Sequence, residues 1–309
     1  MFTNMDQSLI ISSLGWVDKG SLWIFDTKNN SVTTFELSKA DFLTLHQGKD
    51  DYFSVVHHFG DGTVEITAHH FISLTRILSK VIIKPGILQL TGDISTWAYL
   101  PNNYTAFCKQ ILWSDFALIR LHPIEGQVEL QRFNWYDDSY DKGYQGIVGV
   151  TEVPGQELLI VCIQRDSRPI LYDPVSQTKK AHIDLAERHG NPRLYFRKNN
   201  KELWVDDYDT LLKIDPKTWI TLQSARLQGA ASETMEFIGE YSFDVAESLC
   251  VVARPFSKDV VGLDPISMKI RWLCKLAGQP LEATVLPNKC VIARDWKSGA
   301  LLSGRLKRG

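Results

Sequence analysis

The sequence predicts an all-β protein folded as a single β-propeller, and a repeated phrase is the main observation behind this prediction. In this phrase an apolar strand ends in Asp, and a tight turn and a second strand follow. The copies are WIFDTKNNSVTTF, PILYDPVSQTKKAHI, LLKIDPKTWITLQ and VVGLDPISMKIRW, with a fifth, ALIRLHPIEGQVELQ, that has His instead of Asp. The marker residues recur at the interval of roughly 40 to 50 residues that propeller blades have. They are Asp26, His122, Asp173, Asp215 and Asp264.

Proline-containing hairpins form a second repeated element, which precedes the first. WAYLPNNYTAFC, VTEVPGQELLIVC and ATVLPNKCVIAR each place Pro and then Asn or Gly between two apolar strands. Proline fixes φ at the first turn position, and Asn or Gly tolerates the left-handed conformation after it. We therefore expect the chain to reverse direction at Pro101, Pro154 and Pro287.

Together the two elements divide residues 1–309 into seven four-stranded blades of one domain. The predicted blades are 8–38, 42–83, 87–134, 146–185, 192–227, 234–276 and 281–306. The last blade stops after three strands, so we expect an N-terminal strand to complete it and close the ring, because closure removes exposed strand edges. Six or eight blades are the alternatives, since residues 42–95 fit the repeat poorly.

The marker aspartates and most tryptophans are predicted to be structural. An Asp carboxylate can accept hydrogen bonds from backbone N–H groups two residues on, and the Pro that often follows fixes the next φ. Tryptophans inside strands are expected to pack between blades. These are Trp23, Trp97, Trp204, Trp219 and Trp272.

The run GLDPISMKIRWLCKLAGQPLEATVLPNKCVIARD combines an Asp turn, Trp272 in an outer strand, a Gly-containing link and a fresh hairpin. In this order the run resembles the repeats of quinoprotein-like, YVTN-type β-propeller proteins, although the glycine that usually follows the Asp is missing from the turn. The resemblance covers one to two repeats and implies the fold. The paired Gly-His and Trp-Asp signature of WD-repeat propellers is absent.

Composition and charge limit which kinds of partner the protein is expected to bind and which cell compartment it is expected to occupy. The formal net charge is −2 and the pI is about 6.5, which removes the bulk attraction to phosphate backbones, so we expect no nucleic acid partner. The apolar run Leu9–Ile11 is too short for a signal peptide core or a membrane span, and we expect a cytoplasmic protein without membrane contact. The odd number of cysteines, inside strand-like runs, predicts buried reduced thiols; they are Cys108, Cys162, Cys250, Cys274 and Cys290.

Motifs for catalysis or cofactor binding are missing from the sequence. There is no adjacent cysteine pair, Walker loop, HExxH, Ser elbow, zinc-spaced Cys set or EF-hand loop, so we expect no cofactor and no metal and assign no catalytic residue. Histidines flank the GDG turn at residues 60–62. Pairing around that turn places His57 opposite Ile66 and His69 roughly 10 Å further along, too far to share a zinc ion. We expect these histidines to be rim or packed residues.

The segment NWYDDSYDKGYQG, residues 134–146, exceeds what a connection between blades needs. Interleaved aromatic and short polar residues are typical of binding surfaces, because aromatic rings provide contact area at small entropy cost. The predicted partner-binding residues are Trp135, Tyr136, Asp137, Asp138, Tyr140, Asp141 and Tyr144. The alternative is a surface loop whose aromatic residues pack back on blades three and four.

Two classes of function are compatible with this sequence. The first is a non-catalytic propeller that binds another protein, as an adaptor, an inhibitor or an immunity-type partner, and the missing catalytic motifs and the aromatic loop favour it. The alternative is an enzyme or small-ligand binder, lactonase-like, with its site at the central channel. Converging carboxylates and histidines at the channel would favour the enzyme, and an exposed aromatic rim would favour the interaction module.

Overall fold

The computed structural model describes the strands of the chain and most of its C-terminal half. The described residues are 2–3, 9–13, 21–29, 31–36, 42–47, 52–59, 61, 63–71, 73–83, 96–99, 105–112, 115–121, 128–134, 147–153, 156, 158–163, 166–173, 175–176, 178–183, 193–197, 202–207, 209–227, 237–244 and 246–309. None of the described segments is a helix of the length and hydropathy that crossing a membrane requires.

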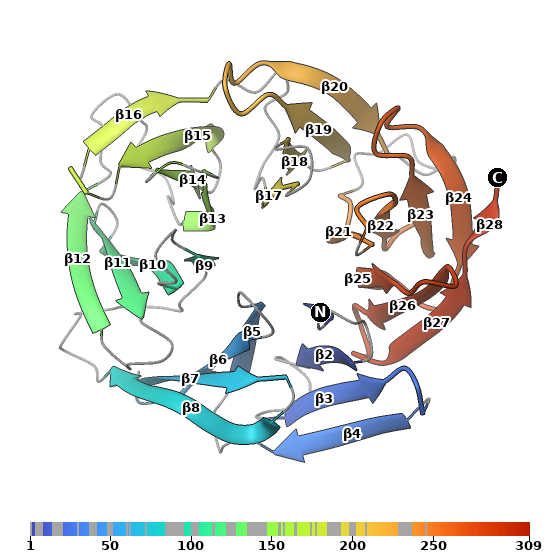
Figure 1. Cartoon of the computed structure of the whole chain (residues 1–309), viewed down its shortest axis with the longest axis horizontal. Helices are drawn as coiled ribbons and strands as arrows, with labels where there is room; N and C mark the ends of the chain where they lie inside the picture. Colours follow the sequence, from blue (N-terminus) through green and yellow to red (C-terminus); the bar gives the residue numbers. More distant parts are fainter. Residues whose placement is uncertain are drawn as a thin grey trace.

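The described strands form seven antiparallel sheets that surround a central axis (Figure 1). Within the first three sheets, the strands follow one another in chain order. Sheet 1 contains β1 (Phe2–Thr3), β2 (Leu9–Ser13), β3 (Ser21–Asp26) and β4 (Ser31–Glu36). Sheet 2 contains β5 (Phe42–Gln47), β6 (Tyr52–His58), β7 (Val64–His70) and β8 (Ser73–Ile83). Sheet 3 contains β9 (Thr96–Tyr99), β10 (Thr105–Leu112), β11 (Asp115–Leu121) and β12 (Val128–Asn134).

The remaining sheets continue the same meander towards the C-terminus. Sheet 4 contains β13 (Ile147–Glu152), β14 (Leu159–Ile163), β15 (Asp166–Asp173) and β16 (Thr178–His182). Sheet 5 contains β17 (Arg193–Phe196), β18 (Leu203–Asp207), β19 (Thr210–Ile214) and β20 (Thr221–Arg226). Sheet 6 contains β21 (Tyr241–Phe243), β22 (Cys250–Arg254), β23 (Asp259–Leu263), β24 (Ile270–Lys275) and the short β28 (Lys307–Arg308). Sheet 7 contains β25 (Pro280–Val285), β26 (Cys290–Asp295) and β27 (Leu301–Arg305).

Burial explains why the strands differ in composition. The first strand of each sheet lies towards the axis and the last lies at the rim (Figure 1). The middle strands are covered on both faces by neighbouring sheets, so β23 (DVVGL) is buried at all five positions, whereas β20 (TLQSAR) at the rim is mostly exposed. The core is therefore divided into layers between adjacent sheets. One layer joins Val251 and Val260 of sheet 6 to Val285 and Val291 of sheet 7.

The repeated Asp turns have the structure that the sequence predicts. The Asp264 Oδ1 accepts hydrogen bonds from the backbone N–H groups of Ile266 (2.8 Å) and Ser267 (3.1 Å). Asp26 and Asp173 cap their turns in the same way. The backbone donor of Ser267, followed by that of Ile266, holds the pKa of Asp264 below its usual value. These aspartates are structural, and His122 lies outside the described residues.

The turns also show what replaces the missing glycine. Met268 has φ 52° and Trp219 has φ 60°, so both take the left-handed conformation at the fifth turn position, which Gly299 (φ 70°) occupies after Asp295. Such a conformation costs a non-glycine residue about 1 to 2 kcal/mol. Met268 and Trp219 offset this cost by packing, since Met268 is buried and Trp219 packs on the core layer between sheets 4 and 5.

Three of the five tryptophans expected inside strands pack between sheets, as predicted, although Trp219 lies in the turn before β20 and not inside a strand. Trp204 is fully buried in the layer between sheets 5 and 6, and Trp219 and Trp272 are partly buried against neighbouring layers. Trp23 is partly buried, and the side chain of Trp97 is not described. Cys250 and Cys274 are buried free thiols, whereas Cys290 is half-buried.

The predicted closure by an N-terminal strand is wrong for the strands that the structure describes. β1 pairs with β2, with Phe2 opposite Ile11, so it is the first strand of sheet 1. Sheet 1 thus has four strands of its own, and its first strand lies towards the axis, away from the rim edge of sheet 7. Sheet 7 keeps three strands, because the chain leaves β27 and adds β28 to β24 of sheet 6.

Candidate functional site

Three aromatic side chains gather where sheets 6 and 7 meet, and we call Phe237, Phe256 and Trp296 the aromatic triad. The ring centroids of Phe237 lie 5.0 Å from Phe256 and 5.3 Å from Trp296, and those of Phe256 and Trp296 lie 6.1 Å apart. All three pairs meet edge to face, with interplanar angles of 75° to 86°. Phe256 is 44% exposed and Trp296 is 45% exposed. The triad is therefore a packed unit with much of its surface in solvent.

The turns that carry the triad belong to one face of the ring. Phe256 lies in the turn between β22 and β23, and Trp296 lies in the turn between β26 and β27. In an antiparallel meander the turns from second to third strand all lie at one end, and the Asp turns from third to fourth strand lie at the other. We call the two ends the triad face and the Asp-turn face.

Backbone hydrogen bonds fix the triad in place. The Trp296 N–H donates to the Gln279 carbonyl (2.7 Å), which ties its turn to the start of β25. Next to Phe237, the Gly239 N–H donates to the Ala253 carbonyl (2.7 Å) on β22. A Cβ at position 239 would overlap the Leu281 carbonyl oxygen, so this approach of link and strand requires glycine. The aromatic rings are held by a rigid frame.

Charges beside the triad are arranged with the acids inside and the cations outside. Asp259 is 0% exposed, and its carboxylate accepts two hydrogen bonds from Arg254 (2.7 and 2.9 Å) and one from Lys275 (2.8 Å). The Lys275 side chain is 67% exposed, and Lys297 next to Trp296 is exposed. The surface around the triad therefore presents positive charge to solvent.

The carboxylate of Asp295 is also used within the fold. It accepts hydrogen bonds from the Gln279 N–H and from the N–H (2.8 Å) and hydroxyl (2.6 Å) of Ser298. Burial by itself would raise the pKa of Asp295, but these donors outweigh burial, and the pKa lies below its usual value. Asp295 is thus an ionised turn cap that shapes the loop under Trp296.

The triad offers a platform for binding, because its rings pack against one another. Rings whose centroids are 5.0 to 6.1 Å apart touch one another, so no ligand-sized gap separates them. Exposed aromatic residues held in fixed positions are typical anchors at protein interfaces. This site was not predicted from the sequence, although the repeats contain a signal for it. VVARPFSK and VIARDWKS place Phe256 and Trp296 at the same step of consecutive repeats.

A buried ionic cluster lies on the Asp-turn face, between sheets 5 and 6. The Arg197 guanidinium donates to the Glu202 carboxylate (2.9 Å) and to the backbone carbonyl of Glu247 (2.7 Å). Lys213 donates to the Pro265 carbonyl (2.8 Å) of the Asp264 turn. Because each group binds a partner across or within the sheets, the cluster locks these two sheets together.

The histidines of sheet 2 lie closer together than predicted. His57 is paired with Glu65, one residue from the expected Ile66, and His69 is paired with Phe53. Both imidazoles lie on the same buried sheet face, where the Nε2 atoms of His57 (3.1 Å) and His69 (2.9 Å) contact the Thr67 hydroxyl. The expected separation considered the backbone only and omitted the reach of the side chains. The histidines are packed residues, and within the described ranges no three metal-binding side chains converge.

The loop predicted to bind a partner lies outside the described residues, which resume at Ile147 after Asn134. This applies to Trp135, Tyr136, Asp137, Asp138, Tyr140, Asp141 and Tyr144. Their role as a binding surface stays a prediction.

Comparisons with known proteins agree on the fold. The structure is similar to a periplasmic gluconolactonase, PpgL, of Pseudomonas aeruginosa, at 15% identity and a TM-score of 0.68, over 97% of this chain and 98% of that chain. It is also similar to the Cps50 (Swd1) β-propeller domain of Myceliophteria thermophila, at 9% identity and a TM-score of 0.67, over 99% of this chain and 95% of that chain. A chain of a mitotic checkpoint complex matches at 8% identity and a TM-score of 0.67, over 99% of this chain and 85% of that chain.

These likenesses show that the chain is an all-β protein with the β-propeller fold, as the sequence predicts. No family model matches the sequence, and no curated protein sequence matches it. The similar structures include an enzyme and a chain of a protein complex, so the fold is shared by both classes of function.

Proposed function

We propose that this chain is a protein-binding module, a single closed propeller of seven blades that uses the aromatic triad to anchor a partner protein. The observation that carries the proposal is the exposure of Phe256 and Trp296 in a triad whose backbone is fixed on both sides. A rigid exposed aromatic residue loses little conformational entropy when a partner covers it.

The charges around the triad define the surface that would fit it. Lys297 follows Trp296 in its turn, and Lys275 is the register partner of Asp259, three residues after Phe256; both lysines are exposed, while Asp259 and Asp295 are engaged inside the fold. A partner with apolar side chains at the centre of its contact and carboxylates at the edge is complementary to this arrangement. Charge pairs at such a rim increase the association rate and the specificity more than the affinity.

The aromatic loop is proposed as a second contact with a protein partner. Its composition supports this role, and its members are Trp135, Tyr136, Asp137, Asp138, Tyr140, Asp141 and Tyr144. We propose a cytoplasmic adaptor, inhibitor or immunity-type protein without nucleic acid or membrane contact, in line with the pI of about 6.5.

Capture of partner proteins from the native host tests the proposal. The purified chain and a Phe256→Ala, Trp296→Ala double variant would be compared, with Ile266→Ala as the matched control. Ile266 is 79% exposed and lies on the Asp-turn face. Loss of two anchors should weaken binding by about 2 kcal/mol or more, roughly thirtyfold, while the melting temperature changes little.

The expected result is a set of proteins retained by the wild type and the control but lost from the double variant. The same proteins retained by a folded double variant would contradict the triad as anchor. The alternative function, an enzyme with a site at the central channel, is favoured by the gluconolactonase among the similar structures. Hydrolysis of sugar lactones that the double variant performs as fast as the wild type would support this alternative.

A further inference from the structure

The rim edge of sheet 7 is one strand short. Sheets 1 to 5 each end in a fourth strand at the rim and sheet 6 ends in a fifth strand, β28, but sheet 7 ends at β27, and none of the described strands pairs with its outer edge. The chain continues to β28, which extends sheet 6 instead. An unpaired edge presents a row of N–H and C=O groups that can pair with another extended segment.

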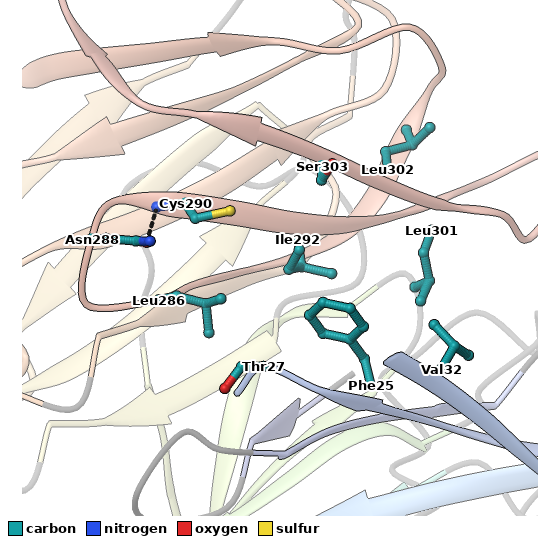
Figure 2. A pocket seen from close by; sticks show the side chains of 10 residues that line it. All are labelled: Phe25, Thr27, Val32, Leu286, Asn288, Cys290, Ile292, Leu301, Leu302 and Ser303. Carbon is teal, nitrogen blue, oxygen red and sulfur yellow. Dashed lines mark hydrogen bonds between the residues drawn. The ribbon is translucent and has the colours of Figure 1, made fainter. Parts of the chain in front are cut away.

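An apolar pocket lies beside this edge, between sheets 7 and 1. Its volume is about 330 Å³, and Figure 2 shows side chains from both sheets around it. Phe25 and Val32 come from β3 and β4, and they face Ile292 of β26 and Leu301 of β27 (Figure 2). Val32 is 46% exposed. A fourth strand on β27 would place every second side chain over these apolar groups.

Positive charge gathers at one end of the edge. Arg305 ends β27, and Lys307 and Arg308 follow it; all three are exposed, and no described ion pair includes them. Arg305 is the register partner of Cys290, whose side chain lines the pocket. In sheets 5 and 6 the fourth strand runs antiparallel to the third. A strand added to β27 in the same way would begin beside Arg305, where the cations lie.

We propose that the outer edge of β27 binds an extended acidic segment of a partner protein as the missing fourth strand. The segment runs antiparallel to β27, with carboxylates at its N-terminal end beside Arg305 and β-branched apolar residues at alternate positions over Val32 and Leu301. Backbone pairing supplies affinity, the pocket selects the alternating side chains, and the cations fix the direction.

The test uses the full chain and a labelled peptide, EETVTVTV, with fluorescence anisotropy as the readout. The reversed peptide, VTVTVTEE, has the same composition but carries its carboxylates at the wrong end. We expect saturable binding of the first peptide and at least tenfold weaker binding of the second. Binding should also weaken as salt is raised, because the charges at the edge are exposed.

Variants of the chain locate the site. Arg305→Glu and Val32→Glu should each weaken binding at least tenfold, whereas Val175→Glu, a matched change at an exposed residue of the turn between β15 and β16, should leave it unchanged. Amide hydrogen exchange at residues 301–305 should slow when the peptide is present, which a contact through side chains alone would not cause. The Phe256→Ala, Trp296→Ala variant should bind the peptide as the wild type does, so this proposal fails or holds separately from the triad.

Several results would overturn the proposal. One is that EETVTVTV does not bind, and another is that the two peptides bind equally well. A third is that Arg305→Glu and Val32→Glu both bind EETVTVTV as the wild type does. Protection, in the free chain, of those amides of residues 301–305 that do not bond to β26 would show that the outer edge is already covered by another segment of the chain. If that protection appears only as the protein concentration rises, together with a dimer in sedimentation, a second copy covers the edge instead.

Discussion

Acid should destabilise this propeller through the buried histidine of sheet 2. His57 is 2% exposed, and burial, with smaller contributions from His69 and Lys80 against the opposing effect of Glu65, lowers its pKa from 6.5 to about 4. Between these two values the unfolded chain binds a proton that the folded chain does not bind. The free energy of unfolding therefore falls as the pH falls from 6.5 towards 4. Between pH 7 and pH 5 the loss due to His57 is about 2 kcal/mol.

Urea unfolding at pH 7 and pH 5 measures this loss in the wild type and in His57→Gln. Glutamine cannot be protonated, so the wild type should lose about 2 kcal/mol more than the variant between the two pH values. His70→Gln, which changes a neighbouring histidine, is the control and should keep the wild-type loss. An equal loss in the wild type and in a folded His57→Gln chain would refute the reasoning, because all other groups titrate in both.

Two further predictions concern packing near the triad. Asp259→Asn should lower the free energy of unfolding by about 3 kcal/mol in urea unfolding, because Arg254 is left without its carboxylate. Lys275→Ala removes only an exposed partner of Asp259 and should lower the free energy of unfolding by less than about 1 kcal/mol. Equal losses in the two variants would contradict the stronger role of the buried pair of Asp259 and Arg254. Gly239→Ala should lower the melting temperature by several degrees in calorimetry, since its Cβ overlaps the Leu281 carbonyl oxygen, and an unchanged melting temperature would show that the link and β25 are not in close contact.

The repeat phrases predicted the positions of the sheets well. The predicted blade 42–83 agrees with sheet 2, which runs from Phe42 to Ile83, even though this stretch fits the repeat poorly. Hairpins and Asp turns are local structures, so the residues within them predict where the chain turns. The chain reverses at Pro287 as predicted, with the Lys289 N–H donating to the Leu286 carbonyl (2.9 Å), but the left-handed residue is Lys289 (φ 61°) and not Asn288 as the sequence predicts.

The features that sequence analysis missed depend on residues far apart in the chain. Phe237, Phe256 and Trp296 come together only because two sheets stand side by side, and each residue alone looks like an ordinary loop aromatic. His57 and His69 both contact Thr67 because of the register between β6 and β7. The register predicted from the GDG turn differs from the observed one by one residue.

The sequence by itself determined the all-β class, the positions of the sheets and the structural role of the marker aspartates, because strands, hairpins and Asx turns depend on neighbouring residues. Only the tertiary structure decided how the ends of the chain pair and which side chains meet between sheets. From the sequence, any free strand of the chain is able to complete the three-stranded sheet 7. In the structure Phe2 pairs with Ile11 within sheet 1, so β1 is not the strand that completes sheet 7. Strand pairing at a rim edge and side-chain packing between sheets join residues that are far apart in the sequence, so local sequence patterns do not predict them.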